Sequence, residues 1–118
     1  MSAPLDATVT DIDPDPLVAL LATDPTVQLI DVREPYERDA GHIAGSLHIP
    51  LVELSSRADE IERERTVVFY CRVGARSDMA AQAFRAAGYR ALSMSGGLVR
   101  WASESRPLSP QDGAVADH

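Results

Sequence analysis

Residues 66–77 read TVVFYCRVGARS, and this stretch decides the fold. From Thr66 to Tyr70 the side chains are β-branched or aromatic, with no polar interruption after Thr66, as expected for a strand covered on both faces. Residues 71–76 contain a glycine and predict a loop, and residues 77–87 have the apolar spacing of a helix. A strand, a tight loop and a helix in succession are typical of an α/β domain with parallel strands.

The rest of the chain repeats this alternation of strand and helix. Further strands are predicted at residues 8–12, 27–32, 46–49 and 90–94. Helices are predicted from residues 13–16 to 24, from 34–35 to 41, over 51–64, and after the glycine pair at 96–97. The pattern predicts one domain over residues 1–106, with a mostly parallel sheet and helices on both of its faces, and a flexible tail over 107–118. Ligands of such sheets bind at the carboxyl ends of the strands, where the loop at 71–76 lies.

Composition and charge exclude several classes of protein. The chain has 118 residues, 45% hydrophobic and 25% charged, which is ordinary for a soluble domain. A net charge of −7 argues against binding to duplex nucleic acid or to an anionic membrane. All eleven basic residues are arginine, so Schiff-base chemistry and a phosphate-loop lysine are excluded within this chain. With no leader-like start and no long apolar run, we expect a cytoplasmic protein with a reduced thiol.

The single cysteine, Cys71, excludes an intrachain disulfide. Together with His42, His48 and His118 it shows no metal-ligand spacing, so no metal site is expected. Cys71 follows a buried strand and precedes a helix, whose N-terminus carries about half a positive charge. Arg72 and Arg76 flank it, and each of these features stabilises a thiolate, the nucleophilic form.

The charges of this loop point to an anionic ligand. An arginine at a helix N-terminus opposes the helix dipole, a conflict that makes sense if a small oxyanion such as thiosulfate, sulfite or phosphate binds there. Arg72 could offer a fork of donors to a sulfonate-like group, and Gly74 permits a positive φ in the loop. Plainer interpretations remain open: Cys71 as a buried small hydrophobe, Arg76 as a structural partner of Asp31 or Glu34, and Ser77 as a helix cap.

Three segments of the chain resemble one known family. The loop CRVGARS at residues 71–77 resembles the active-site loop of rhodanese-like domains. DVREPYE at 31–37, followed by GHIAGS at 41–46, resembles the family's upstream signature, and Gly96-Gly97 before Trp101 resembles its closing motif. The segments occur in the family's order and at its usual separations, and the resemblance covers about residues 7–106.

This resemblance implies a rhodanese-like α/β fold with a mainly parallel five-stranded sheet. It implies that Cys71 accepts a sulfane sulfur from a donor, commonly thiosulfate, and passes it from a persulfide to a thiol, to cyanide or to a partner protein. No metal or organic cofactor is implied. The implied substrate cradle is Arg72, Val73, Gly74, Ala75, Arg76 and Ser77. Asp31 and Arg33 are implied as a structural pair beside the site, and structural roles are expected for His42, His48 and Trp101.

Rival functions share this fold. Related phosphatases use Cys-x5-Arg, whereas this chain has Cys-x4-Arg from Cys71 to Arg76, and the resemblance associates the shorter loop with sulfur. The loop also lacks an acid that could protonate a leaving alcohol. A persulfide relay to a cofactor- or tRNA-modifying partner would use the same chemistry, and a non-catalytic binding module is disfavoured by the presence of Cys71. The sequence leaves the physiological donor and acceptor, the pathway and the oligomeric state open.

Overall fold

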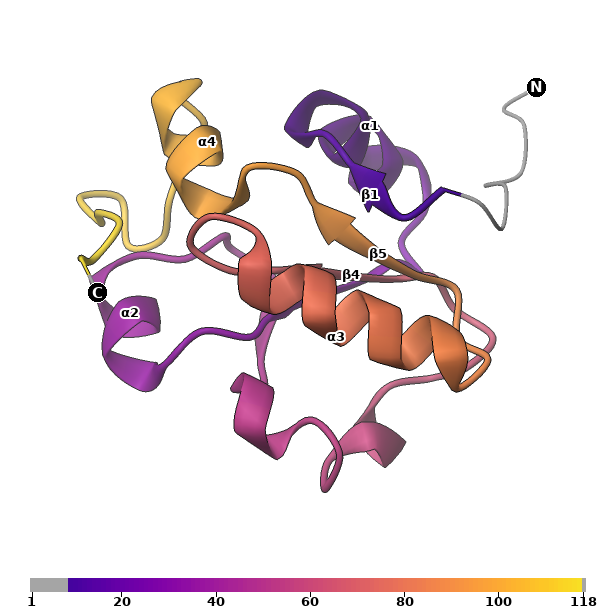
Figure 1. Ribbon diagram of the computed structural model, residues 1–118. Helices are drawn as coiled ribbons and strands as arrows, with labels where there is room; N and C mark the ends of the chain where they lie inside the picture. Colours follow the sequence, from indigo (N-terminus) through magenta and orange to yellow (C-terminus); the bar gives the residue numbers. More distant parts are fainter. Residues whose placement is uncertain (1–8, 118) are drawn as a thin grey trace.

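The computed structural model describes residues 9–117, which form an α/β domain around one five-stranded sheet (Figure 1). The strand order is β1-β5-β4-β2-β3, and all neighbouring strands are parallel. The strands are β1 (Asp11–Ile12), β2 (Gln28–Asp31), β3 (Leu47–His48), β4 (Val67–Tyr70) and β5 (Ala91–Met94). The helices are α1 (Pro14–Thr23), α2 (Pro35–Ala40), α3 (Ala75–Ala86) and α4 (Gly97–Ser103). The predicted α/β fold with a parallel sheet is confirmed.

Strand β4 lies at the centre of the sheet, and its side chains pack into the hydrophobic clusters on both faces. Its alternate residues Val67 and Phe69 belong to the cluster under α3, where the ring of Phe69 lies 5.1 Å from that of Phe84. Val68 and Tyr70 belong to the opposite cluster, under α1 and α4. All four residues of β4 are fully buried, as the uninterrupted apolar run predicts. Helices therefore cover both faces of the sheet, and α3 lies in front of it in Figure 1.

The helix predicted over residues 51–64 is wrong. The structure has two short 3-10 turns there, Leu51–Glu53 and Ala58–Glu60. Only Leu54 and Ile61 are buried in this segment, and the burial of two side chains is too little packing to stabilise a continuous helix of this length. The charged side chains between Leu54 and Ile61 stay at or near the surface.

The ends of the chain depart from the predicted pattern in smaller ways. The first strand spans only β1, and Thr8, where it was predicted to begin, lies outside the described residues, as does His118. The segment 107–117 forms no helix or strand, but Ser109 makes an isolated antiparallel bridge with His42. Its predicted flexibility stays a prediction. Among residues 9–117, no helix is long and apolar enough to cross a membrane.

Candidate active site

Cys71 lies at the carboxyl end of β4, where only 1% of its surface is exposed. The chain reverses directly after it, because Gly74 adopts a φ of +113° as the residue that caps α3. This turn aims the backbone N–H of Gly74 at the sulfur, and the nitrogen lies 3.0 Å from Cys71 Sγ. A hydrogen bond from a helix-start amide stabilises negative charge on sulfur.

Helix α3 begins at Ala75, two residues earlier than the predicted start at Ser77. The left-handed backbone of Gly74 lets the helix start at once. Arg76 therefore lies inside the first turn and not just before it. Ser77 is also within the helix and does not cap it; the structure records no side-chain cap for α3.

The start of α4 holds the cysteine loop from the other side. The backbone N–H of Leu98 donates to Cys71 O at 2.8 Å, and that of Val99 donates to Arg72 O at 3.0 Å. These are N–H groups that a helix start leaves without intrahelical partners. A Cβ on Gly97 would lie 2.4 Å from Arg72 O, so only glycine fits this contact. The closing Gly96-Gly97 motif thus lets α4 pack directly on the loop.

A chain of hydroxyl groups runs under the sulfur. Ser77 Oγ lies 3.5 Å from Cys71 Sγ and 2.7 Å from Ser93 Oγ, and it donates to Gly74 O at 3.1 Å. Ser77 and Ser93 are both fully buried. Ser93 was not predicted as a site residue, although a serine within the otherwise apolar strand β5 was a signal for a polar contact on that face. Because the Ser77 hydroxyl has one proton, it can donate either to Gly74 O or to the sulfur, and it lies within reach of both.

Arg76 forms a two-pronged ion pair with Glu37 of α2. Its Nη1 and Nη2 donate to the two carboxylate oxygens at 2.7 and 3.0 Å. Burial alone would raise the pKa of Glu37. The hydrogen bonds from Arg76 and from the backbone N–H of Glu34 to its carboxylate hold that pKa below its ordinary value. The same pair raises the pKa of Arg76. The predicted partners of Arg76 were Asp31 or Glu34; the observed partner is Glu37, which the capping box of α2 turns inward.

Asp31 and Arg33 form a fully buried ion pair beside the site. Arg33 Nε and Nη2 donate to the carboxylate at 2.9 and 2.8 Å, and Nη2 also donates to Gly41 O at 2.8 Å. Tyr70 donates to the same carboxylate at 3.3 Å, and burial together with the charge of Asp31 raises the pKa of Tyr70 to about 12. Although burial of the guanidinium opposes its charge, Asp31 raises the pKa of Arg33. This network fixes the carboxyl end of β2 next to that of β4.

The remaining predicted residues occupy the rim or the frame of the site. Arg72 is half-buried, and its guanidinium meets the segment 107–117; Val73 and Ala75 are exposed. His42 and His48 each direct a ring nitrogen to a backbone carbonyl, of Arg38 and Arg33 respectively. Within residues 9–117 no three His, Cys, Asp or Glu side chains gather as a metal site would require.

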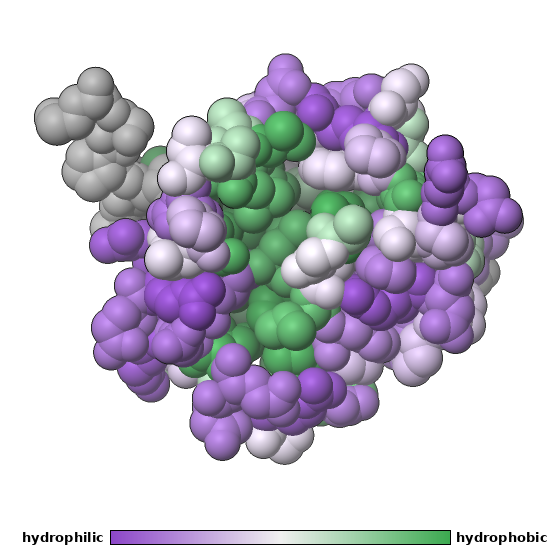
Figure 2. Space-filling view, turned by 180° about the vertical axis from the view of Figure 1, so that it is seen from behind, coloured by the Kyte–Doolittle hydropathy of each residue, from purple (hydrophilic) through white to green (hydrophobic). Residues whose placement is uncertain are grey.

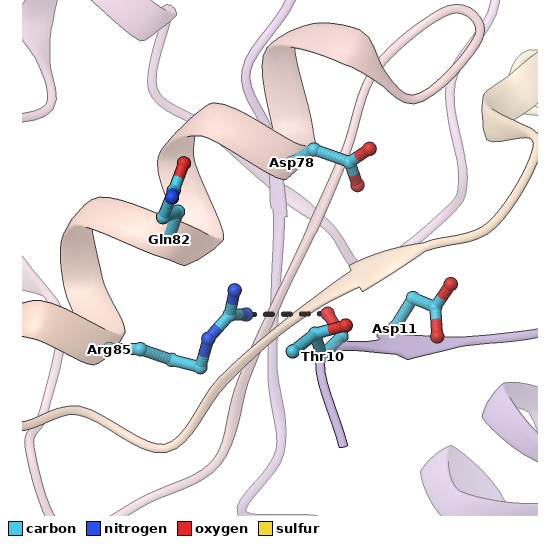
Figure 3. A pocket seen from close by; sticks show the side chains of 5 residues that line it. All are labelled: Thr10, Asp11, Asp78, Gln82 and Arg85. Atoms are coloured by element: carbon cyan, nitrogen blue, oxygen red, sulfur yellow. Dashed lines mark hydrogen bonds between the residues drawn. The ribbon is translucent and has the colours of Figure 1, made fainter. Parts of the chain in front are cut away.

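Two hollows on the surface of the described residues lie away from the cysteine loop, and no residue of 71–77 lines either of them. One, of about 220 Å³, lies between β1 and α3, where Arg85 donates to Thr10 O at 3.3 Å (Figure 3). The other, of about 330 Å³, is apolar and is lined by residues of α1 and α4 and of the segments near Ile43 and Leu108. Apolar side chains gather on the face behind α3, seen in Figure 2. Neither hollow contains a nucleophile with an activating partner.

The sequence of this chain is similar to those of known proteins. The family model described as "Rhodanese-like domain" matches residues 13–104. A protein named sulfurtransferase, from Allochromatium vinosum, is 38% identical over 106 residues, which are 89% of this chain and 99% of that protein. A probable adenylyltransferase/sulfurtransferase, MoeZ of Mycobacterium tuberculosis, is 40% identical over 82 residues, but the match spans only 21% of its length.

Solved structures with the same fold include proteins described as rhodanese-related, in agreement with the sequence matches. A rhodanese-related protein from Thermoplasma volcanium superposes with a TM-score of 0.74 at 29% identity, over 84% of this chain and 96% of that one. A Rhodopseudomonas palustris protein described as a possible tyrosine phosphatase superposes with a TM-score of 0.72 over 92% and 98% of the two chains, but at 19% identity this likeness shows the fold alone. With the family model spanning strands β2 to β5 and the cysteine loop, and with relatives named for sulfur transfer, the chain belongs to the rhodanese-like domain family.

Proposed function

We propose that this chain is a sulfurtransferase that moves a sulfane sulfur from a donor such as thiosulfate to a thiophilic acceptor through a persulfide on Cys71. The observation that carries the proposal is the hydrogen bond from Gly74 N–H to Cys71 Sγ at 3.0 Å, made at the start of α3. It supplies a fixed donor for a sulfur that must be anionic to attack and that ends as an anionic persulfide.

The proposed reaction has two displacements. The Cys71 thiolate attacks the outer sulfur of thiosulfate, an S–S bond forms, and the donor's own S–S bond breaks as sulfite leaves with its electron pair. In the second step an acceptor thiolate or cyanide attacks the outer sulfur of the persulfide, and the Cys71 thiolate leaves. Both steps pass only a sulfur atom to and from Cys71, which suits a thiol with 1% of its surface exposed.

The arrangement of Arg76 favours sulfur over phosphate chemistry. A phosphatase of this kind would present an arginine fork to the equatorial oxygens of a phosphate. Here two nitrogens of the Arg76 fork are engaged by Glu37, at 2.7 and 3.0 Å. The loop is also one residue shorter, with four residues between Cys71 and Arg76.

Intact-mass measurement tests the first displacement. We expect wild type to gain about one sulfur mass, roughly 32 Da, with thiosulfate and to lose it on reduction. Cys71→Ser is a clean control, because Cys71 is the chain's only cysteine. No gain with thiosulfate or with any other sulfane donor would refute the proposal and would leave a binding module. Hydrolysis of an aryl phosphate that depends on Cys71 would support the phosphatase instead.

A persulfide relay between proteins is the second candidate. The chain matches part of MoeZ, part of a putative sulfur carrier protein from Bacillus subtilis, and 14% of the length of a tRNA sulfurtransferase from Desulfurococcus amylolyticus. In a relay, the Cys71 thiolate would attack the outer sulfur of a desulfurase persulfide and release the desulfurase thiolate. Rapid loading by a desulfurase with slow loading by thiosulfate would favour the relay. We propose that either reaction takes place in the cytoplasm, where a thiol such as that of Cys71 is kept reduced.

A further inference from the structure

The segment that follows α4 is docked against the end of α2. Its Ser109 exchanges two backbone hydrogen bonds with His42, at 2.9 and 2.7 Å, and Ala114 N–H donates to Ala40 O at 2.8 Å. The fit is close, because a Cβ on Gly41 would lie 2.5 Å from Ala114 O. Residues 109–114 are therefore held at the edge of the candidate active site by backbone contacts.

The next residues of this segment reach the cysteine loop. Arg72, the neighbour of Cys71, donates from Nε to Ala116 O at 3.2 Å. Its Nη2 lies 3.5 Å from a carboxylate oxygen of Asp117. The Asp117 side chain is 99% exposed, whereas that of Arg72 is 28% exposed. A carboxylate thus lies beside the cation that adjoins the nucleophile.

We propose that residues 113–117, here named the strap, set the charge selectivity of the cysteine site, with Asp117 as the specificity-determining residue. The carboxylate of Asp117 pairs with the guanidinium of Arg72. An anionic sulfur donor must therefore compete with Asp117 for Arg72, whereas a neutral reagent does not need to. An exposed ion pair of this kind shifts an equilibrium by at most about fivefold. The strap therefore weakens the entry of anions without closing the site. This inference rests on the proposed sulfur-donor site, because it names the donor's charge as the property that is selected.

Alkylation of Cys71 with two reagents of different charge tests the strap without sulfur transfer. In the full chain, we expect Asp117→Asn to raise the ratio of the iodoacetate rate to the iodoacetamide rate about two- to fivefold. Asp112→Asn is the matched control, since Asp112 is exposed, lies in the same segment and forms no salt bridge among residues 9–117. It removes the same net charge, so it should leave the ratio nearly unchanged. An equal change in both variants, or none in Asp117→Asn, would overturn the proposal.

Two further variants assign the effect to the contact with Arg72. Gly41→Ala should unseat the strap at Ala114 and raise the same ratio. In an Arg72→Ala background, Asp117→Asn should change the ratio no more than Asp112→Asn does. A full effect that persists without Arg72 would refute the assignment.

Thiosulfate kinetics separate the strap from the proposed function. We expect the KM for thiosulfate to fall about two- to fivefold in Asp117→Asn with kcat unchanged. If the alkylation ratio shifts as expected but no donor loads Cys71, the proposed function fails and the strap stands. If thiosulfate loads Cys71 but neither the ratio nor the KM changes, the strap alone fails.

Discussion

An alanine at position 97 would drive a methyl group into the backbone of the cysteine loop. Its Cβ would lie 2.4 Å from Arg72 O and 2.6 Å from Val73 N, and neither atom belongs to a flexible side chain. The φ of +62° at Gly97 costs an L-residue roughly 1–2 kcal/mol. Relief of the clash would stretch the two hydrogen bonds between α4 and the loop, and overpacking of this kind costs roughly 1–3 kcal/mol more.

Gly45→Ala separates these two costs. Gly45 has a φ of +84° but no atom within 4 Å of an added Cβ, so it carries the backbone cost alone. In urea unfolding we expect Gly97→Ala to lower the free energy of unfolding by roughly 1–3 kcal/mol more than Gly45→Ala does. Iodoacetamide should also alkylate Cys71 faster in Gly97→Ala only, because the loop loses its clamp. Equal stabilities within about 0.5 kcal/mol would refute the packing of α4 on the loop.

The buried polar groups beside the loop give three more expected outcomes. Although burial would raise the pKa of Glu37, Arg76 holds that pKa below its ordinary value. The ion pair therefore contributes fully to the free energy of unfolding above the ordinary glutamate range, and this contribution is lost as the pH falls through the lowered pKa. Urea unfolding of Glu37→Gln should therefore show a deficit of roughly 1–3 kcal/mol at neutral pH that shrinks in acid, and a deficit independent of pH would contradict this. Burial raises the pKa of Tyr70 to about 12, so the ultraviolet titration of Tyr70→Phe should lack the transition near that pH. Asp31→Asn leaves the charge of Arg33 buried and should cost roughly 3–5 kcal/mol in thermal unfolding, whereas a loss below about 1 kcal/mol would refute the assigned pair.

The centre of the sheet could be predicted because its signal is local. Residues 67–70 are apolar without interruption, and β4 is indeed buried on both faces. The position of Cys71 at its carboxyl end follows from the strand alone. The segment 51–64 could not be predicted in the same way, since helix and 3-10 turns bury the same two anchors, Leu54 and Ile61.

The partners of the site residues depend on tertiary contacts. Ser93 and Ser77 are sixteen residues apart, and the pairing of β5 with β4 places Ser93 where it meets Ser77 of α3, which in turn contacts the sulfur. Glu37 meets Arg76 because α2 turns one of several nearby carboxylates inward, a choice that spacing does not reveal. Sequence patterns thus identified the loop and its residue types, while the contacts that tune them came from packing.

The ion pair between Asp31 and Arg33 also has a consequence for the order of folding. The two residues are separated by a single position, and Arg33 N–H donates to Asp31 at 3.0 Å as well. Because so short a segment needs almost no loop closure, the charges can pair before the strands around them assemble. If they do, the sheet closes over a neutral pair and not over two separate ions, which lowers the desolvation cost of burying Arg33, the largest fully buried side chain among residues 9–117.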